Sequence, residues 1–247
     1  PTPEAQAIPI DSARSYFTYL PDSRTLRFDE LSVESKWGRG SLEGQAEIGL
    51  PVDGRIGDLV GQFRLSGLTV NPADFYPEPV SVAVAELDFQ LSTSPFLLEI
   101  GRLQVEDDGN VATGNGTIRA DARGWEIALD GQMNALRPAR LLELWPMAVK
   151  PKSRKWIAEN VKAGTMRDIS GAVRLRAGEE PENFLSFDFS DGEVRFLRTM
   201  PHLTGARGHA TLVRNRFVVV ADEGVVTADQ GGEVDVTGTA FIIPDVK

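Results

Sequence analysis

The chain of 247 residues has no cysteine, only two histidines and no long apolar run. Without cysteine it has no disulfide, no thiolate metal ligand and no thiol nucleophile. His202 and His209 show no metal-ligand spacing, and neither a nucleophile elbow nor a dinucleotide-binding glycine loop occurs. No apolar stretch approaches the roughly 18–20 residues that span a bilayer. We therefore expect neither an enzyme nor a protein that needs a metal or a cofactor.

The charge balance is acidic, with 26 Lys and Arg against 36 Asp and Glu, which gives a net charge of −10. Such a chain is a poor candidate for binding nucleic acid. Its content of 41% hydrophobic and 25% charged residues is ordinary for a folded protein. The proline-rich start and the end at Lys247 are typical of a section of a longer protein, so any anchoring segment is expected outside it.

Glycine followed by an alternation of polar and apolar residues recurs along the chain. Side chains alternate between the two faces of a strand, so each of these stretches has one apolar face and one polar face. The turns are short and no parallel βαβ rhythm is present, which predicts a large, mainly antiparallel sheet of roughly fourteen strands. The stretches begin at Gly44, Gly61, Gly116, Gly131, Gly171, Gly208 and Gly238.

Helical segments are few. Residues 11–21 predict a short helix capped by Asp11, and residues 138–165 predict a helical insertion between two β sections at 1–137 and 166–247. Within the insertion, one helix begins at Pro138, and a second covers residues 151–163 with Gly164 as its C-cap. A bulge is predicted at Gly101, because the apolar alternation changes parity there.

The covering of the apolar face decides the function, because two short helices are too small to cover so large a sheet. A sandwich or a closed barrel buries the face against itself, whereas a curled trough leaves it open to a ligand. The alternation alone does not distinguish a sandwich, a barrel and a trough, and it does not show whether the odd- or the even-numbered residues of a strand point inward. The apolar residues of strand parity are Phe63, Leu65, Leu87, Phe89, Leu91, Leu98, Ile100, Leu103, Val105, Ile127, Leu129, Val173, Leu175, Phe187, Phe189, Val194, Phe196, Val234 and Val236.

The helical insertion carries a family resemblance. An aromatic–proline pair at Trp145 and Pro146, then Arg154, Trp156 and Gly164, resembles a helix that interrupts β-repeats in the AsmA-like superfamily, YhdP-type branch. The similarity continues through residues 187–208 and 217–226. Before residue 138 it is limited to the strand alternation and the recurring glycines. Members are long proteins of the diderm cell envelope, anchored in the inner membrane and largely periplasmic. They resemble bridge-like lipid transfer proteins, whose stacked β-repeats form a groove for acyl chains.

The resemblance implies a mostly β, antiparallel, repeat-built curled sheet that forms a groove with a short helical insertion. It implies a section of a periplasmic lipid conduit, in which the nineteen apolar residues hold acyl chains for phospholipid transport between the inner and outer membranes. The implied partners are a phospholipid or other acyl-chain lipid, an inner-membrane anchor and further repeats of the same protein. Edge-to-edge self-association is a second possible contact. The chain departs from the family in being far shorter and in lacking the anchor.

A basic group is unusual in so acidic a chain. Lys150, Lys152, Arg154 and Lys155 stand at or near the start of the second predicted helix, with Lys162 beyond them. We predict that the first four attract anionic headgroups, and the alternative is a solvated face with aliphatic stems lying over apolar surface. The alternative to the whole function is a closed β-sandwich binding module or structural spacer with no lipid cargo.

Overall fold

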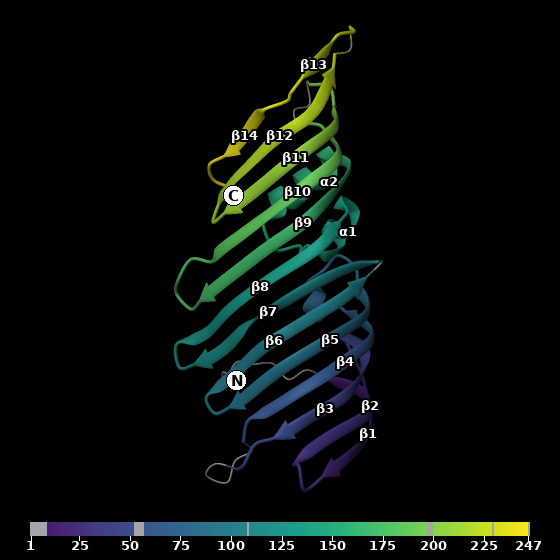
Figure 1. The fold of residues 1–247 in the computed structure, drawn as a ribbon, viewed down its shortest axis with the longest axis vertical. Coiled ribbons are helices and arrows are strands. Elements are labelled where there is room, and N and C mark those ends of the chain that lie inside the picture. Colours follow the sequence, from purple (N-terminus) through teal and green to yellow (C-terminus); the bar gives the residue numbers. More distant parts are fainter. Residues whose placement is uncertain (1–8, 52–56, 108, 197–199, 229, 247) are drawn as a thin grey trace. The chain divides into compact units, whose positions relative to one another are not determined.

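A computed structural model describes residues 9–51, 57–107, 109–196, 200–228 and 230–246. All of its strands belong to one open antiparallel sheet, whose order follows the chain from β1 to β13, while β14 pairs with β12 (Figure 1). This confirms the predicted fold class, a mostly β, antiparallel curled sheet with a short helical insertion. The strands are β1 (Ile10–Leu20), β2 (Thr25–Ser35), β3 (Gly38–Ile48), β4 (Leu59–Val70), β5 (Val80–Thr93), β6 (Phe96–Asp107), β7 (Asn110–Asp121), β8 (Gly124–Leu136), β9 (Val161–Arg176), β10 (Glu182–Val194), β11 (Leu203–Val213), β12 (Arg216–Thr227), β13 (Glu233–Asp235) and β14 (Thr239–Ile243).

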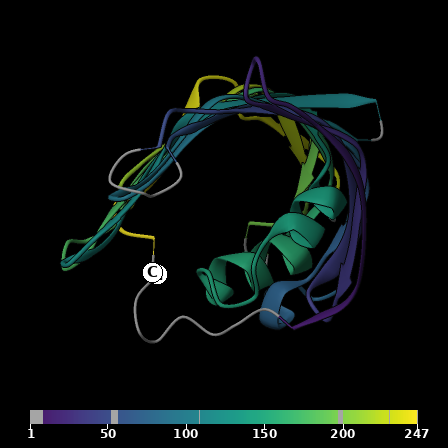
Figure 2. The same cartoon turned by 90° about the horizontal axis from the view of Figure 1, so that it is seen from below.

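The chain forms two compact units. Unit 1 comprises Pro1–Asp74, Glu78–Gly131 and Val173–Pro181, and it holds β1 to β7, most of β8 and the end of β9. Unit 2 comprises Phe75–Pro77, Gln132–Ala172 and Glu182–Lys247, and it holds both α-helices and β10 to β14. Within each unit the strands bend along their length (Figure 2).

The prediction of a helix over residues 11–21 was wrong, because these residues form β1. Phe17 lies opposite Phe28 of β2, and Tyr19 lies opposite Leu26. Aromatic residues favour strands, and β2 offers backbone partners along most of β1, which an isolated helical turn does not have. A tertiary hydrogen-bond ladder therefore outweighs the local signal of Asp11 as a cap.

The helical insertion contains α1 (Pro138–Leu144) and α2 (Pro151–Asn160). Each begins at the proline that the sequence predicts, since proline at the first helical position loses no hydrogen bond. The second helix ends three residues earlier than predicted, and β9 starts at once at Val161. Gly164 is therefore not a C-cap: it has φ +137° inside β9, where a Cβ would lie 3.3 Å from the Cα of Gly192 on β10.

Glycines leave room on the sheet for the rings of neighbouring strands. A Cβ built at Gly61 would lie 2.6 Å from Cε1 of Phe89, its cross-strand partner. The same relation holds in unit 2, where a Cβ at Gly208 would lie 2.9 Å from Cζ of Phe189. Four glycines of the sequence pattern, at positions 44, 61, 116 and 208, therefore lie against a large apolar side chain of the adjacent strand.

The described residues contain no sealed core of large side chains. The buried hydrophobic residues are five alanines, two leucines and one valine. No large side chain is less than 2% exposed. A sandwich of this size would enclose many leucines and phenylalanines completely. The apolar side chains therefore lie on an open sheet, and a part of each one reaches the surface.

Candidate functional site

The apolar side chains of unit 1 lie on one face of its sheet. Directly paired residues of antiparallel strands point to the same side. Phe63 pairs with Leu87, and Leu87 pairs with Leu103, so these three side chains form one row across β4, β5 and β6. The next row contains Phe89 paired with Ile100. We call the set the apolar face of unit 1: Phe28, Leu31, Leu42, Phe63, Leu65, Leu87, Phe89, Leu91, Leu98, Ile100, Leu103, Val105, Ile127, Leu129, Val173 and Leu175.

A β-bulge keeps this face continuous along β6. The pairing of β5 with β6 shifts register between Asp88 and Phe89, so that Asp88 lies opposite Arg102 while Phe89 lies opposite Ile100. Gly101 is the extra residue, as the change of parity predicts. Ile100 and Leu103 are three positions apart, so in a regular strand without the bulge they would point to opposite faces of the sheet.

Contacts of β8 and β9 place the remaining members of the face. A Cβ at Gly116 would lie 2.9 Å from Cδ2 of Leu129, so Leu129 lies over the row that contains Ile100. Arg174 of β9 donates two hydrogen bonds of 2.8 Å to the Asp130 carboxylate. Asp130 and Arg174 thus lie on the opposite face, and the odd-numbered residues beside them lie on the apolar face.

Aromatic rings on neighbouring strands contact one another in succession across the apolar face. The centroids of Phe17 and Phe28 are 6.0 Å apart, those of Phe28 and Phe63 are 5.8 Å apart, and those of Phe63 and Phe89 are 5.5 Å apart. Further along the sheet, Trp125 contacts Phe96 at 5.7 Å. Ring contacts of this kind contribute about 0.5–1.5 kcal/mol each beyond the area that they bury. They order the face without covering it.

The opposite face of unit 1 is charged. Glu86 accepts hydrogen bonds of 2.8 Å from both Arg64 and Arg102, and these ion pairs join β4, β5 and β6. All three side chains are at least one-third exposed. Unit 1 is therefore a sheet with one hydrated, ion-paired face and one apolar face.

The apolar face remains accessible over its whole length. None of the nineteen predicted lining residues is buried, and Val173 and Val234 are 39% and 59% exposed. Thirteen of the nineteen belong to the apolar face of unit 1, from Phe63 to Leu175. The other six belong to unit 2: Phe187, Phe189, Val194, Phe196, Val234 and Val236.

In unit 2 the helices lie on the concave side of the bent strands (Figure 2). Trp156 of α2 contacts Phe196 with a centroid distance of 6.3 Å, and Phe196 contacts Phe241 of β14 at 5.5 Å. Phe241 pairs with Val219 of β12, on the same side of the sheet as the apolar residues of β10 and β11. The helices therefore pack on the apolar side of this unit and cover a part of it.

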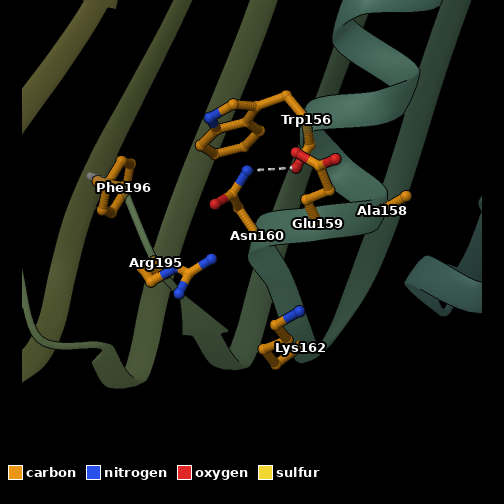
Figure 3. A pocket seen from close by; sticks show the side chains of 7 residues that line it. All are labelled: Trp156, Ala158, Glu159, Asn160, Lys162, Arg195 and Phe196. Atoms are coloured by element: carbon orange, nitrogen blue, oxygen red, sulfur yellow. Dashed lines mark hydrogen bonds between the residues drawn. The ribbon is translucent and has the colours of Figure 1, made fainter. Parts of the chain in front are cut away.

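A pocket of about 700 Å³ opens beside α2 (Figure 3). Its lining combines two aromatic rings with two cations. The Arg195 guanidinium points toward α2, below the Asn160 side chain (Figure 3). The lining residues are Trp156, Ala158, Glu159, Asn160, Lys162, Arg195 and Phe196.

No protein-family model, curated protein or solved structure matches this chain. The family resemblance of the helical insertion is thus supported by the sequence pattern alone.

The structure separates the four basic residues that the sequence assigns to headgroups. Lys150 donates hydrogen bonds to the Val246 carbonyl at 2.6 Å and to Asn215 Oδ1 at 3.1 Å. Arg154 donates to the Leu142 carbonyl at 3.0 Å and so links α2 to α1. These two cations hold the helices in place.

Lys152 and Lys155 are exposed, and Lys155 forms an ion pair of 3.7 Å with Glu159. None of the four lines the pocket. Arg195, which does line it, was missed at the sequence level, because a single arginine after a predicted strand carries no distinguishing signal. The sequence places Lys162 in the basic group but assigns it no headgroup role.

Shifted pKa values belong to exposed side chains at strand ends and in turns. The side chain and the backbone N–H of Arg123 lower the pKa of Asp121, and the hydroxyl and the backbone N–H of Thr237 lower the pKa of Asp235. Asp121 in turn raises the pKa of Arg123. The described residues contain no group of three His, Asp or Glu side chains that could hold a metal ion. None of the described helices has the length and apolar character needed to cross a membrane.

Proposed function

We propose that this protein holds acyl chains of an amphipathic lipid on the apolar face of its open sheet, as a section of a periplasmic lipid conduit. The observation that carries the proposal is the incomplete burial of all nineteen lining residues, among them Phe63, Leu87 and Phe89. An apolar surface this extended is rare on a soluble protein unless a ligand or partner covers it.

The mechanism is physical. Removing one CH₂ group from water is favourable by about 0.8 kcal/mol, so a chain of about sixteen carbons that loses half of its hydration gains roughly 6 kcal/mol. Neighbouring rows of the face offer nearly the same chemistry, since a leucine, isoleucine or phenylalanine recurs in each. A lipid can therefore move from row to row without a large barrier, while its headgroup stays in water. The direction of movement would come from a gradient or from partners.

The arrangement of the charged face supports the same function. The ion pairs of Glu86 with Arg64 and Arg102 keep one side of unit 1 hydrated. The apolar contact is thereby confined to the other side, as a conduit with one lipid-facing wall requires. The periplasmic location, the inner-membrane anchor and the further repeats belong to this proposal through the family resemblance.

The test compares two neighbouring residues of β5 that point to opposite faces. Phe89→Asp places a charge on the apolar face, and Gln90→Asp places the same charge on the charged face. The full chain is delipidated, incubated with a fluorescent phospholipid, and examined by native mass spectrometry and fluorescence. We expect about tenfold lower uptake for Phe89→Asp, from the cost of placing a carboxylate beside an acyl chain, and less than twofold change for Gln90→Asp.

Both variants should fold, because both side chains reach solvent in the described structure, and circular dichroism checks this. Equal uptake by the two variants would show that lipid does not occupy the apolar face. A wild-type chain that carries no lipid after gentle purification and takes up none would favour the alternative, a module without lipid cargo.

A further inference from the structure

The pocket beside α2 in unit 2 has a charge pattern that the acyl-chain function does not use. It lies where α2 ends at Asn160, β9 begins at Val161 and the chain leaves β10. The backbone N–H of Arg195 donates to the Asn160 carbonyl at 2.9 Å, which joins these elements. Asn160 is only 9% exposed, and its Nδ2 donates to the Trp156 carbonyl at 2.8 Å. The pocket thus has a rigid frame.

Two cations in this pocket lack a counter-charge. Among the described residues, neither Lys162 nor Arg195 forms an ion pair, whereas the one acidic lining residue, Glu159, pairs with Lys155. The end of α2 carries a partial negative charge of about 0.5, which favours nearby cations but does not neutralise two of them. The pocket therefore has a positive excess.

The guanidinium of Arg195 has an unfilled hydrogen-bonding position. Its Nε is buried, and no hydrogen-bond acceptor contacts it within the described parts of the chain. A buried donor without an acceptor is destabilising, and guanidinium groups bind phosphate oxygens with paired, charge-assisted hydrogen bonds. Since the Nε itself is sealed from solvent, a phosphate in the pocket would bind the terminal nitrogens of this guanidinium, which lines the pocket.

The rest of the lining is apolar and aromatic. Trp156 and Phe196 line the same pocket as the cations (Figure 3). Phe241 extends the ring contacts onto β14. A small inorganic anion would contact the cations but not the aromatic rings. A phosphate attached to a hydrocarbon chain would contact the cations through its oxygens and the rings through its chain.

We propose that this pocket binds the phosphate group of an amphipathic ligand, with Lys162 and Arg195 holding the phosphate and Trp156 and Phe196 contacting the adjoining acyl chain. The identity of the ligand's apolar part rests on the proposed function, whereas the phosphate site rests on the pocket itself.

The experiment measures the preference of the full chain for dioleoyl phosphatidylglycerol over dioleoylglycerol, which has the same acyl chains and no phosphate. The test variant is Lys162→Gln/Arg195→Gln. The matched control is Lys36→Gln/Lys152→Gln, which removes the same charge from exposed positions outside the pocket and leaves the ion pair of Lys155 with Glu159 intact. We expect the wild type and the control to prefer the phospholipid at least about tenfold in native mass spectrometry. The test variant should lose that preference and retain its binding of dioleoylglycerol.

Three outcomes overturn the inference. A test variant with the wild-type preference shows that the pocket does not bind the phosphate. A control that loses as much preference as the test variant shows a non-specific effect of charge. Inorganic phosphate that binds to Arg195 as tightly as the phospholipid, by NMR titration, identifies a site for the free anion. In each case, undiminished binding of dioleoylglycerol would still support the proposed acyl-chain function. That function is tested separately by the binding of dioleoylglycerol to the Phe89→Asp variant, which should be weakened.

Discussion

Replacing Gly61 with alanine places a methyl group beneath the Phe89 ring, and the result reports whether that ring is free to move. The new Cβ would lie 2.6 Å from Cε1 and 2.7 Å from Cζ of Phe89, so the ring must shift. The nearest backbone atom, the Gln45 carbonyl oxygen, is 3.3 Å away and requires only a small adjustment. The substitution therefore acts mainly through one side chain.

The cost depends on what lies above the ring. On an open face Phe89 swings toward solvent and loses its contact with Phe63, which is worth about 0.5–1.5 kcal/mol. Alanine also restricts the unfolded chain and thereby stabilises the fold by about 0.4–1 kcal/mol. We expect a net change of less than about 1 kcal/mol in the free energy of unfolding. Under a second layer the ring has nowhere to go, and overpacking costs about 1–3 kcal/mol.

Gly44→Ala is the matched comparison, since Gly44 lies opposite Phe63 on the same face of the neighbouring strand. Its φ of +141° is a conformation that glycine adopts and other residues avoid. An alanine Cβ would overlap the Gln62 carbonyl oxygen, so the backbone itself must move. We expect a loss on the order of 3 kcal/mol.

Urea unfolding of the full chain, followed by far-ultraviolet circular dichroism, measures both changes. A loss for Gly61→Ala that equals the loss for Gly44→Ala would refute the reasoning, because it would place Phe89 in a closed interior. A small loss for both would instead refute the assignment of Gly44 to a position that only glycine tolerates.

Two further predictions concern charges in unit 1. Glu86→Gln should weaken the ion pairs with both Arg64 and Arg102. The free energy of unfolding should fall by only about 1 kcal/mol, because the three groups are partly exposed. This loss should be smaller in 1 M NaCl than at low salt, and an equal loss in the two conditions would contradict an ionic origin. Asp121 should titrate below its ordinary pKa of 3.8 in an NMR titration, and Arg123→Ala should raise its pKa only part of the way back, because the backbone N–H groups of residues 123 and 124 remain. Because its pKa is lowered in the folded state, this contact stabilises the fold above about pH 4 and ceases to do so as the pH falls through the lowered pKa. An unchanged pKa in Arg123→Ala would exclude the Arg123 side chain as a cause.

Much of the fold follows from local pattern. The strand alternation around Phe89, the bulge at Gly101 and the prolines that start α1 and α2 were all predicted correctly. Each depends on the geometry of a few consecutive residues, which the sequence displays directly. The helix predicted over residues 11–21 failed because β2 supplies a hydrogen-bonding partner that no local pattern reveals.

The candidate site was predictable in part. The alternation identifies which residues of one strand share a face, and the register, which the sequence did not predict, places Phe63, Leu87 and Leu103 in one row. The basic residues show the limit of this reasoning. The hydrogen bond of Lys150 with Val246 spans 96 positions of the sequence. Lys162 and Arg195 line one pocket only because β9 and β10 are neighbours. Charge near a helix start does not indicate which carbonyl group or pocket a side chain reaches.

The sequence by itself determined that this chain forms a two-faced antiparallel sheet, because the period of two and the recurring glycines are properties of neighbouring residues. Only the tertiary structure decided that the described residues leave the apolar face of unit 1 uncovered, and that Lys162 and Arg195 line one pocket with Trp156. Covering a face and assembling a pocket depend on contacts between segments far apart in the chain. Such contacts arise from the packing of whole elements, which the order of the residues does not display.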